Sequence, residues 1–360
     1  MKKVLVIIVS IVLLFSSCHS GTGRTLTSAT GSIYECLVVI PSAALTADER
    51  ALLHGQSLYN NGSAYDEPIA TIYDLVRSTM SADMPCLPQM EPYFTLTCVT
   101  PEAFDDFLKP TRNILIVDID ATKYTSVRAK FSTDYWSHPQ AVYRIQSPDQ
   151  SAFVNYWLSH GAEIREWFVR RELERHATFY RASTNKSARA ALQSSLGCDM
   201  LIEEDYMLIM DTTNFIWCCN NKGSMRRDLV IYAYPYTDMR QLSPDSLMHK
   251  RDEMMARYVH ASTKGSYMGT EYNVFPPQTR SVPALQPTNE FFAYETRGLW
   301  KIFHGESMGG PFVSLTRVDT IHRQIITAET FLYASGQKKR NALRQAEAIL
   351  YTLQFVQSNQ

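Results

Sequence analysis

A serine between two glycines stands near the end of the chain, in the stretch FHGESMGGPFVS at residues 303–314. Gly305, Ser307 and Gly309 form the pattern GxSxG, which in serine hydrolases places the nucleophile on a strained turn between a buried strand and a helix. LWKIF, just before the pattern, fits a strand. Pro311 and FVSLTRV, just after it, also fit a strand because they are rich in β-branched and aromatic residues. Strands on both sides predict a glycine-rich hairpin loop around Ser307.

The partners that a nucleophilic serine requires are also incomplete. In hydrolases with this pattern the chain order is serine, then an acid, then histidine. His322 is the only histidine after Ser307, and Asp319 precedes it by three residues on one short turn. The hairpin loop is therefore the favoured interpretation, and an envelope hydrolase with Ser307 as nucleophile is the alternative.

A second stretch whose residue types suit chemistry is ILIVDIDAT at residues 114–122. It resembles the apolar strand and DxDxT start of haloacid-dehalogenase phosphotransferases, in which the first acid, here Asp118, is the nucleophile and the second, here Asp120, an acid/base. Those enzymes also need a later strand that ends in paired acids and holds magnesium, and none follows residue 122. A buried strand that ends in aspartate at a turn explains the same letters. A phosphatase that uses Asp118 stays as an alternative.

The third candidate is aromatic and suits binding more than catalysis. Tyr232, Tyr234 and Tyr236 alternate along one expected strand and so point to one face of the sheet. Tyrosine offers a flat apolar face with a polar tip, so the three residues would line a groove for a peptide or a sugar, or pack beneath a helix. Three further residues of another strand would join such a groove: Arg297, Trp300 and His304.

Composition narrows the classes of function. The 360 residues include 35 Lys and Arg and 36 Asp and Glu, a formal net charge of −1. This balance argues against the basic stripe of a nucleic-acid-binding protein, so no nucleic acid is expected as a partner. No CxxC pair occurs, and the adjacent Cys218 and Cys219 do not have the spacing of a zinc site, so neither a metal nor a cofactor is expected. The spacing leaves the disulfide pairing open among Cys36, Cys86, Cys98, Cys198, Cys218 and Cys219.

The N-terminus predicts export and a lipid anchor. Residues 1–17 are typical of a signal peptide, because Lys2 and Lys3 precede an apolar run that is too short to span a membrane. The small residues before Cys18 resemble a bacterial lipobox, so Cys18 is expected to carry the lipid and become the new N-terminus. Residues 18–32, rich in Gly, Ser and Thr, are expected to form a flexible tether. We expect the protein to face the periplasm from the outer membrane in preference to the inner one.

Helix signals recur along the mature chain and must position the candidates above. Three triplets of Ser or Thr, then Pro, then an acid are each expected to start a helix, because the hydroxyl caps a backbone NH and the acid faces the helix dipole. They begin at Thr100, Ser147 and Ser243. The longest helix is expected from about Pro148, with the charged residues 165–175 facing solvent and stabilised by pairs such as Glu166 with Arg170, four residues apart.

These elements predict an α+β protein built from two α/β-sandwich-like halves. A helix over 188–196 that ends at Gly197 separates an N-terminal half, residues 33–197, from a C-terminal half, residues 198–360. In the second half, strands from about residue 267 to 333 and a final helix at about 338–355 predict an antiparallel sheet covered by helices. The order is similar to the PsbP and Mog1 folds in topology alone.

Several stretches together resemble one family. They are RNILIVDID at 112–120, YPYTD at 234–238, KRD at 250–252, GSYM at 265–268, RGLWK at 297–301 and MGGPFVS at 308–314. They look like the Bacteroidota lipoprotein family called domain of unknown function 4837, through nearly all of the mature chain. The resemblance implies an envelope location and one full-length architecture, and it implies no reaction, ligand or catalytic residue.

The sequence as a whole thus predicts a lipid-anchored, non-catalytic envelope protein. Its membrane partner is the bilayer that holds the lipid on Cys18, and its two halves are expected to offer a surface or cleft to a protein, a peptide or a small ligand. The alternative remains a hydrolase with Ser307 or Asp118 as nucleophile.

Overall fold

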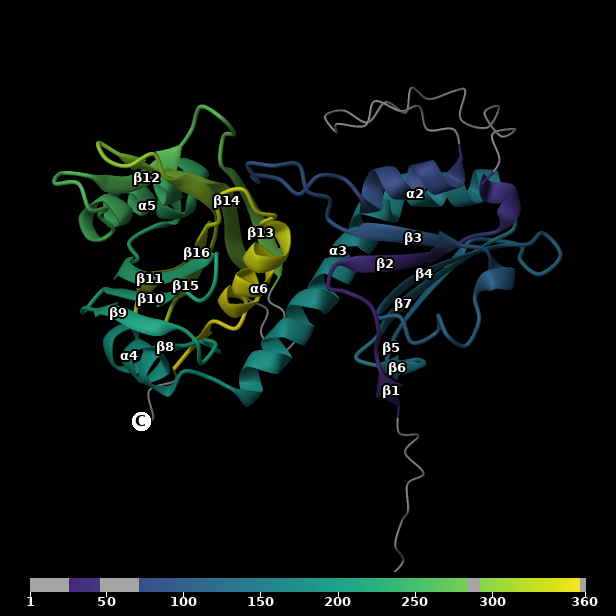
Figure 1. The fold of residues 1–360 in the computed structure, drawn as a ribbon, viewed down its shortest axis with the longest axis horizontal. Helices are drawn as coiled ribbons and strands as arrows, with labels where there is room; N and C mark the ends of the chain where they lie inside the picture. The colour runs from purple at the N-terminus through teal and green to yellow at the C-terminus, as the bar shows by residue number, and fades with distance from the viewer. Residues whose placement is uncertain (1–25, 46–70, 284–291, 357–360) are drawn as a thin grey trace, which may run out of the picture.

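The computed structural model describes residues 26–45, 71–283 and 292–356, and its two large sheets have a long helix running between them (Figure 1). The expected α+β class is confirmed, with a mostly parallel sheet in the N-terminal half and an antiparallel sheet in the C-terminal half. The expected signal peptide, Cys18 and the first part of the tether lie outside the described residues.

The N-terminal half is built on a five-stranded sheet in the order β3-β2-β4-β7-β5. Four of its strands are parallel, and β5 lies antiparallel to β7 at the edge. Strand β4 reads NILIVDI, a nearly continuous apolar run, because a central strand of a parallel sheet is covered on both faces. The strands are β2 (Glu35–Val39), β3 (Thr95–Val99), β4 (Asn113–Ile119), β5 (Arg128–Thr133) and β7 (Ala141–Ser147).

Helices α2 (Ile72–Met80) and α3 (Gln150–Ala182) pack together on one face of this sheet. The expected long helix is thus confirmed, but its cap differs from the prediction. The side chain of Asp149 accepts the hydrogen bond from the Ala152 amide, whereas the Ser147 hydroxyl donates to a backbone oxygen. Aspartate takes the cap because its carboxylate also favours the positive end of the helix dipole.

The other two triplets have different outcomes. Ser243 accepts from the Ser246 amide and starts α5 (Pro244–Tyr258), as expected. Thr100 precedes only the short 3-10 turn η3 (Pro101–Ala103) and makes no side-chain capping bond, so the helix expected there is absent.

The charged stretch of α3 is not the solvated face that the sequence suggests. Glu172 is fully buried and accepts hydrogen bonds from Arg112 (Nε, 3.0 Å) and from Asn113 (Nδ2, 2.6 Å) on the neighbouring sheet. Glu166 contacts Arg165 of the same helix and Arg280 of the C-terminal half, and Arg170 pairs with Glu174. Residues on other elements determine these ion pairs, and the spacing along one helix does not reveal such residues.

The C-terminal half contains an eight-stranded antiparallel sheet in the order β12-β14-β15-β16-β11-β10-β9, with β13 also paired to β14. Strands β12 and β13 therefore follow one another along the same side of β14. The strands are β9 (Met207–Asp211), β10 (Phe215–Asn220), β11 (Arg226–Pro235), β12 (Tyr267–Glu271), β13 (Gln278–Pro283), β14 (Phe292–Phe303), β15 (Gly309–Asp319) and β16 (Gln324–Tyr333).

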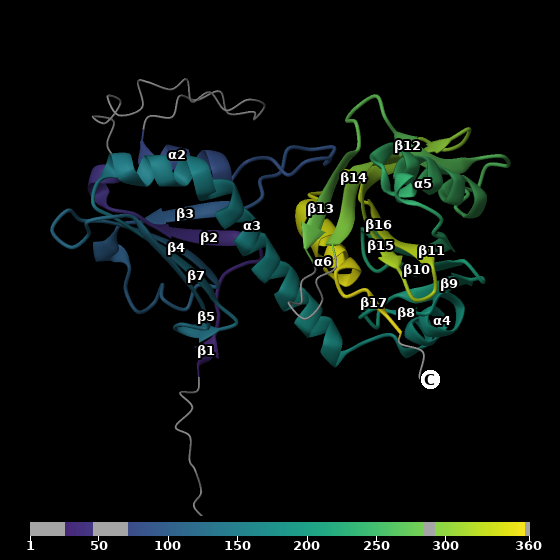
Figure 2. The ribbon, with the colours of Figure 1, turned by 180° about the vertical axis from the view of Figure 1, so that it is seen from behind.

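Helices cover both faces of this sheet. Helix α5 packs on one face over a core that includes Tyr232, Trp300 and Phe312. Helix α6 (Arg340–Leu350) packs on the other face against β15 and β16, and α4 (Lys186–Leu196) lies against β9 and β10 (Figure 2). The left-handed Gly197 ends α4, as expected.

The two halves meet where α3 passes beside α6, an arrangement that both views show (Figures 1 and 2). The loop between α2 and β3 adds a second connection. Its residue Glu91 is buried and accepts hydrogen bonds from the first amides of α6, those of Lys339 (2.6 Å) and Arg340 (3.1 Å). A side chain of one half thus caps a helix of the other.

Candidate functional site

The structure places Ser307 in an exposed loop between two antiparallel strands, so the hairpin interpretation is confirmed. In the described part of the chain, Ser307 makes no hydrogen bond to a histidine. His322 pairs with Asp319 (2.6 Å) at the far end of β15. An eleven-residue strand spans about 30 Å, which separates this pair from Ser307.

Close packing explains the glycines of the same segment. A Cβ atom at Gly310 would lie 2.0 Å from the Leu332 carbonyl oxygen, and one at Gly305 would lie 2.7 Å from the Ser266 Cβ. The bare backbone at Gly310 leaves room for the Trp300 indole, whose NH donates to that carbonyl at 3.3 Å. The glycines of GxSxG and its neighbours are therefore used for strand packing.

Asp118 and Asp120 lie at the carboxyl end of β4 but do not form part of a larger acidic cluster. Asp118 accepts a hydrogen bond from the Tyr124 hydroxyl (2.5 Å), and Asp120 pairs with Lys123 at 2.7 Å. The hydrogen bond from Lys123 lowers the pKa of the Asp120 carboxyl. Among the described residues, no three His, Cys, Asp or Glu side chains converge as a metal site would require.

The six residues expected to share a groove are distributed over different parts of the C-terminal half. Tyr232 is buried beneath α5, and Trp300 is buried in the same core. Arg297 lies on the opposite face of the sheet, where it pairs with Glu347 of α6. His304 is exposed in the hairpin loop. The alternation of side chains along β14 separates Arg297 from Trp300, so no single groove contains them all.

Two of the tyrosines remain partly accessible. Tyr234 and Tyr236 are half-buried, and Tyr234 contributes to an open pocket of about 400 Å³ at the start of α5. The Lys250 ammonium lies 5.3 Å from the centre of the Tyr234 ring. This pocket contains no buried polar group without a partner among the described residues.

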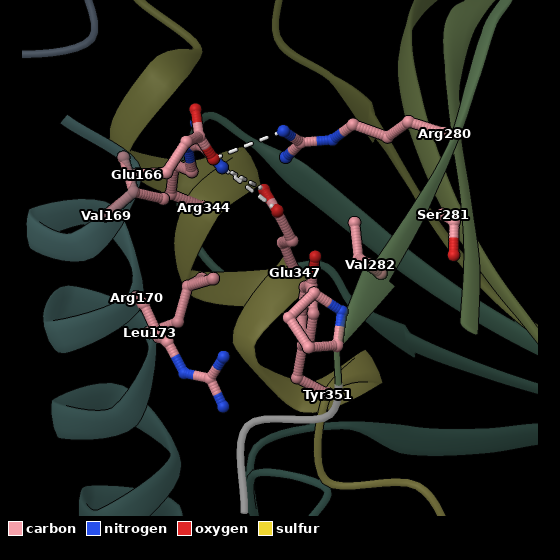
Figure 3. Close-up of a pocket in the computed structure, with 11 residues that line it drawn as sticks. Glu166, Val169, Arg170, Leu173, Arg280, Ser281, Val282, Arg344, Glu347 and Tyr351 are labelled. Atoms are coloured by element: carbon pink, nitrogen blue, oxygen red, sulfur yellow. Dashed lines mark hydrogen bonds and ion pairs between the residues drawn. The ribbon is translucent and has the colours of Figure 1, made fainter. Parts of the chain in front are cut away.

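A second pocket, of about 180 Å³, lies between the two halves (Figure 3). Helix α3 supplies one wall, strand β13 the opposite wall and helix α6 the floor (Figure 3). Its lining residues are Glu166, Val169, Arg170, Leu173, Arg280, Ser281, Val282, Pro283, Arg344, Glu347 and Tyr351. We call this pocket the cleft.

A buried network of charges forms the back of the cleft. Glu347 of α6 is fully buried and accepts two hydrogen bonds from Arg344 Nη1, both at 3.0 Å, and a third from Arg297. Arg297 also donates to Glu295 (Nε, 2.9 Å), which accepts in addition from Arg280 (Nε, 2.9 Å). Burial raises the pKa of the Glu295 carboxyl, but the neighbouring Arg297 and Arg280 outweigh it, so the pKa lies below its ordinary value.

Like Arg297, whose Nη1 is also buried without a partner among the described residues, Arg344 has unused donor capacity. Its side chain is 1% exposed and packs against the rings of Tyr93 and Tyr34, with the guanidinium carbon 5.3 Å and 5.8 Å from their centres. Nη2 of Arg344 is buried and makes no hydrogen bond to any described residue. Such a group costs about 1–3 kcal/mol or more unless a water or a ligand satisfies it.

Arg280 closes one side of the cleft across the two halves. Its Nη1 lies 3.2 Å from the Glu166 carboxylate of α3 (Figure 3). Its Nε donates to Glu295 of β14. The Arg280 side chain is 44% exposed, so part of this guanidinium side chain stays accessible to solvent.

The cleft could not be recognised in the sequence, because its residues come from three elements far apart in the chain. A signal was nevertheless present. Arg344 and Glu347 lie within the apolar stripe of α6, between Leu343 and Leu350, where charged residues are not expected. Glu295 and Arg297 share a strand face with the buried Ala293. Charges on core-facing positions of two elements indicate a buried ionic network.

The structure also describes the state of the cysteines and the character of the helices. The six cysteines after Cys18 are all free thiols, five of them buried. None of the helices in the described ranges is long and apolar enough to cross a membrane.

Comparison with known families divides the chain in two. Residues 185–352 match the domain of unknown function DUF4837, so the resemblance seen in the sequence is confirmed for this part. Residues 67–181 match a different domain of unknown function, DUF8532. The expectation that one resemblance runs through nearly all of the mature chain is therefore wrong, and RNILIVDID falls in the second match. None of the curated proteins matches the chain.

The solved structures found by comparison are distant. The Ran-binding protein Mog1p of Saccharomyces cerevisiae covers 45% of this chain with 92% of its own, at 4% identity and a TM-score of 0.29. A protein from Bacteroides thetaiotaomicron covers 46% with 47% of its own, at 11% identity and a TM-score of 0.26. The lipid transfer and protein localization domain of human StarD13 covers 41% with 89% of its own, at 9% identity and a TM-score of 0.20. Likenesses at these scores carry no argument about function.

Proposed function

We propose that this chain, whose residues 185–352 form a DUF4837 domain, is a lipid-anchored binding protein of the bacterial cell envelope that holds a ligand in the cleft between its two halves. The observation that carries the proposal is the buried ionic network of the cleft, which keeps a guanidinium nitrogen of Arg344 unpartnered beside a pocket. Buried charges that serve stability alone are normally satisfied, so this arrangement favours a ligand.

The lipid anchor rests on the N-terminal sequence. The signal peptide, the small residues before Cys18 and the Gly, Ser and Thr-rich tether together support a lipoprotein that faces the periplasm from the outer membrane. A tether leaves the folded halves free to meet soluble or membrane-bound partners.

A binding role is favoured over a hydrolytic one by the surroundings of the two candidate nucleophiles. Ser307 lies in a hairpin loop about 30 Å from the Asp319 and His322 pair. Asp118 accepts from Tyr124, and Asp120 pairs with Lys123, an arrangement that suits a structural turn.

Fractionation of cells that express the wild-type chain or Cys18→Ala tests the anchor. The wild type is expected to sediment with membranes, and the variant to be released or to keep its signal peptide. A processed Cys18→Ala chain that still sediments with membranes would contradict the anchor. Reaction of the purified protein with a fluorophosphonate probe tests the binding role, because labelling that is lost in Ser307→Ala would establish an esterase instead.

A further inference from the structure

The charges in and behind the cleft leave two guanidinium nitrogens without acceptors. Arg170 pairs with Glu174, and the other two guanidinium groups of the lining, those of Arg280 and Arg344, face the carboxylates of Glu166 and Glu347. Glu347 is already occupied by Arg344 and Arg297, and Glu166 by Arg165 and Arg280. Nη2 of Arg344 and Nη1 of Arg297 are buried without a hydrogen-bond partner among the described residues, so an anionic group is the complement.

The geometry of the Arg344 guanidinium limits which kinds of anion the cleft can bind. Nη2 of Arg344 is held in place because Nη1 of the same guanidinium is bound to both oxygens of Glu347 at 3.0 Å. A fixed, planar donor is well suited to a carboxylate or a phosphate. The size of the cleft, about 180 Å³, corresponds to roughly six water molecules and disfavours a bulky polyphosphate.

Both facing walls of the cleft also carry apolar side chains. Val169 and Leu173 of α3 lie opposite Val282 and Pro283 of β13. Aliphatic side chains on two facing walls favour a short aliphatic group between them, because its burial removes apolar surface from water. The same ligand must therefore carry an anionic head and a small apolar body.

We infer that the cleft binds a carboxylate that adjoins a short aliphatic group, as in the C-terminal residue of a peptide that ends in leucine or in a short branched-chain acid. The carboxylate accepts from Arg344 Nη2 and from Arg280, and the aliphatic group lies between α3 and β13. This inference rests on the proposed binding function and names the ligand class of the same site.

Calorimetric titration of the full chain, purified in detergent, tests the inference with three probes. N-acetyl-L-leucine has the carboxylate and the aliphatic group, N-acetyl-L-leucinamide has the same shape without the charge, and 4-methylpentanoate lacks the amide. We expect the amide to bind at least about tenfold more weakly than the acid, a difference of about 1.4 kcal/mol. Similar affinities for 4-methylpentanoate and N-acetyl-L-leucine would indicate a free acid as ligand. Clearly tighter binding of N-acetyl-L-leucine would indicate a peptide C-terminus.

Substitutions in the cleft test whether N-acetyl-L-leucine binds there. Arg280→Gln keeps the hydrogen-bonding capacity of a partly exposed side chain and is expected to weaken N-acetyl-L-leucine at least about fivefold. Arg181→Gln, on the exposed end of α3 away from the cleft, is the matched control and is expected to change the affinity less than about twofold. Arg344→Lys keeps the charge but loses the planar donor, and is expected to weaken the acid more than the amide.

Two results would overturn the inference, and only the second would also overturn the proposed binding function. Equal affinities for the acid and the amide would show that the carboxylate is not recognised, while the proposed binding function would stand. Absence of binding by all three probes would show that water satisfies Arg344 Nη2, and the cleft would then be a structural joint between the halves.

Discussion

The carboxylate of Glu91 gives the sharpest test of how the two halves are held together. Glu91 belongs to the N-terminal half, is 6% exposed, and accepts hydrogen bonds from the amides of Lys339 (2.6 Å) and Arg340 (3.1 Å) at the start of α6. Helix α6 has no capping side chain of its own, because Lys339 occupies its N-cap position. Glu91→Ala therefore leaves two buried amides without acceptors.

The expected magnitude follows from these contacts. A hydrogen bond to a charged group contributes about 1.5–3 kcal/mol, so the loss of two gives a destabilisation of about 3 kcal/mol by the lower value. Glu91→Gln keeps one carbonyl acceptor and should lose about half as much. Glu253→Ala is the control, because Glu253 is an exposed acid of α5 whose pair with Lys250 contributes well under 1 kcal/mol.

Urea unfolding followed by tryptophan fluorescence measures these free energies. Hydrogen exchange adds a local readout, since the Lys339 and Arg340 amides should lose protection in Glu91→Ala while the amides of α5 keep theirs. A loss in Glu91→Ala within about 0.5 kcal/mol of that in Glu253→Ala, with unchanged exchange in α6, would refute the capping of one half by the other.

Two further predictions concern the hairpin and the half-buried His176. Gly310→Ala should destabilise the protein by about 1–3 kcal/mol in thermal or urea unfolding, because its Cβ would meet the Leu332 oxygen at 2.0 Å. The control Ser307→Ala, at an exposed position, should change the stability by less than about 0.5 kcal/mol. Equal losses in the two variants would contradict the packing role of Gly310. Burial lowers the pKa of His176 to about 4. The unfolded chain binds this proton near pH 6.5 and the folded chain only near pH 4, so the free energy of unfolding should fall as the pH drops from about 6.5 to 4. His176→Gln should make the free energy of unfolding depend less steeply on pH in this range. The same pH dependence in both proteins would contradict the prediction.

Features governed by neighbours in the sequence could be predicted. The flanks of Ser307 were enough to distinguish a hairpin from an elbow, because β-branched residues after Pro311 favour a strand. Gly197 marked the end of α4, and Ser243 with Pro244 marked the start of α5. Each of these signals lies within a few residues of the structure it determines.

Features that depend on distant partners could not be predicted in the same way. Glu172 looks like part of a solvated charge run until Arg112 and Asn113 are brought against it. Strand β13 reads QTRSVP, which is polar and ends in proline, so its pairing with β14 gives only a weak periodic signal. The cleft combines both difficulties, since Arg280, Arg344 and Glu166 lie on three elements that only the tertiary fold brings together.

The most direct test of the central claim, that the cleft between the halves is the ligand site, is a crystal structure of the protein with N-acetyl-L-leucine. We predict that the carboxylate lies between Arg344 and Arg280 and that the leucine side chain contacts Val169 and Val282. A ligand bound instead at the open pocket beside Tyr234, with the cleft unchanged, would contradict the claim.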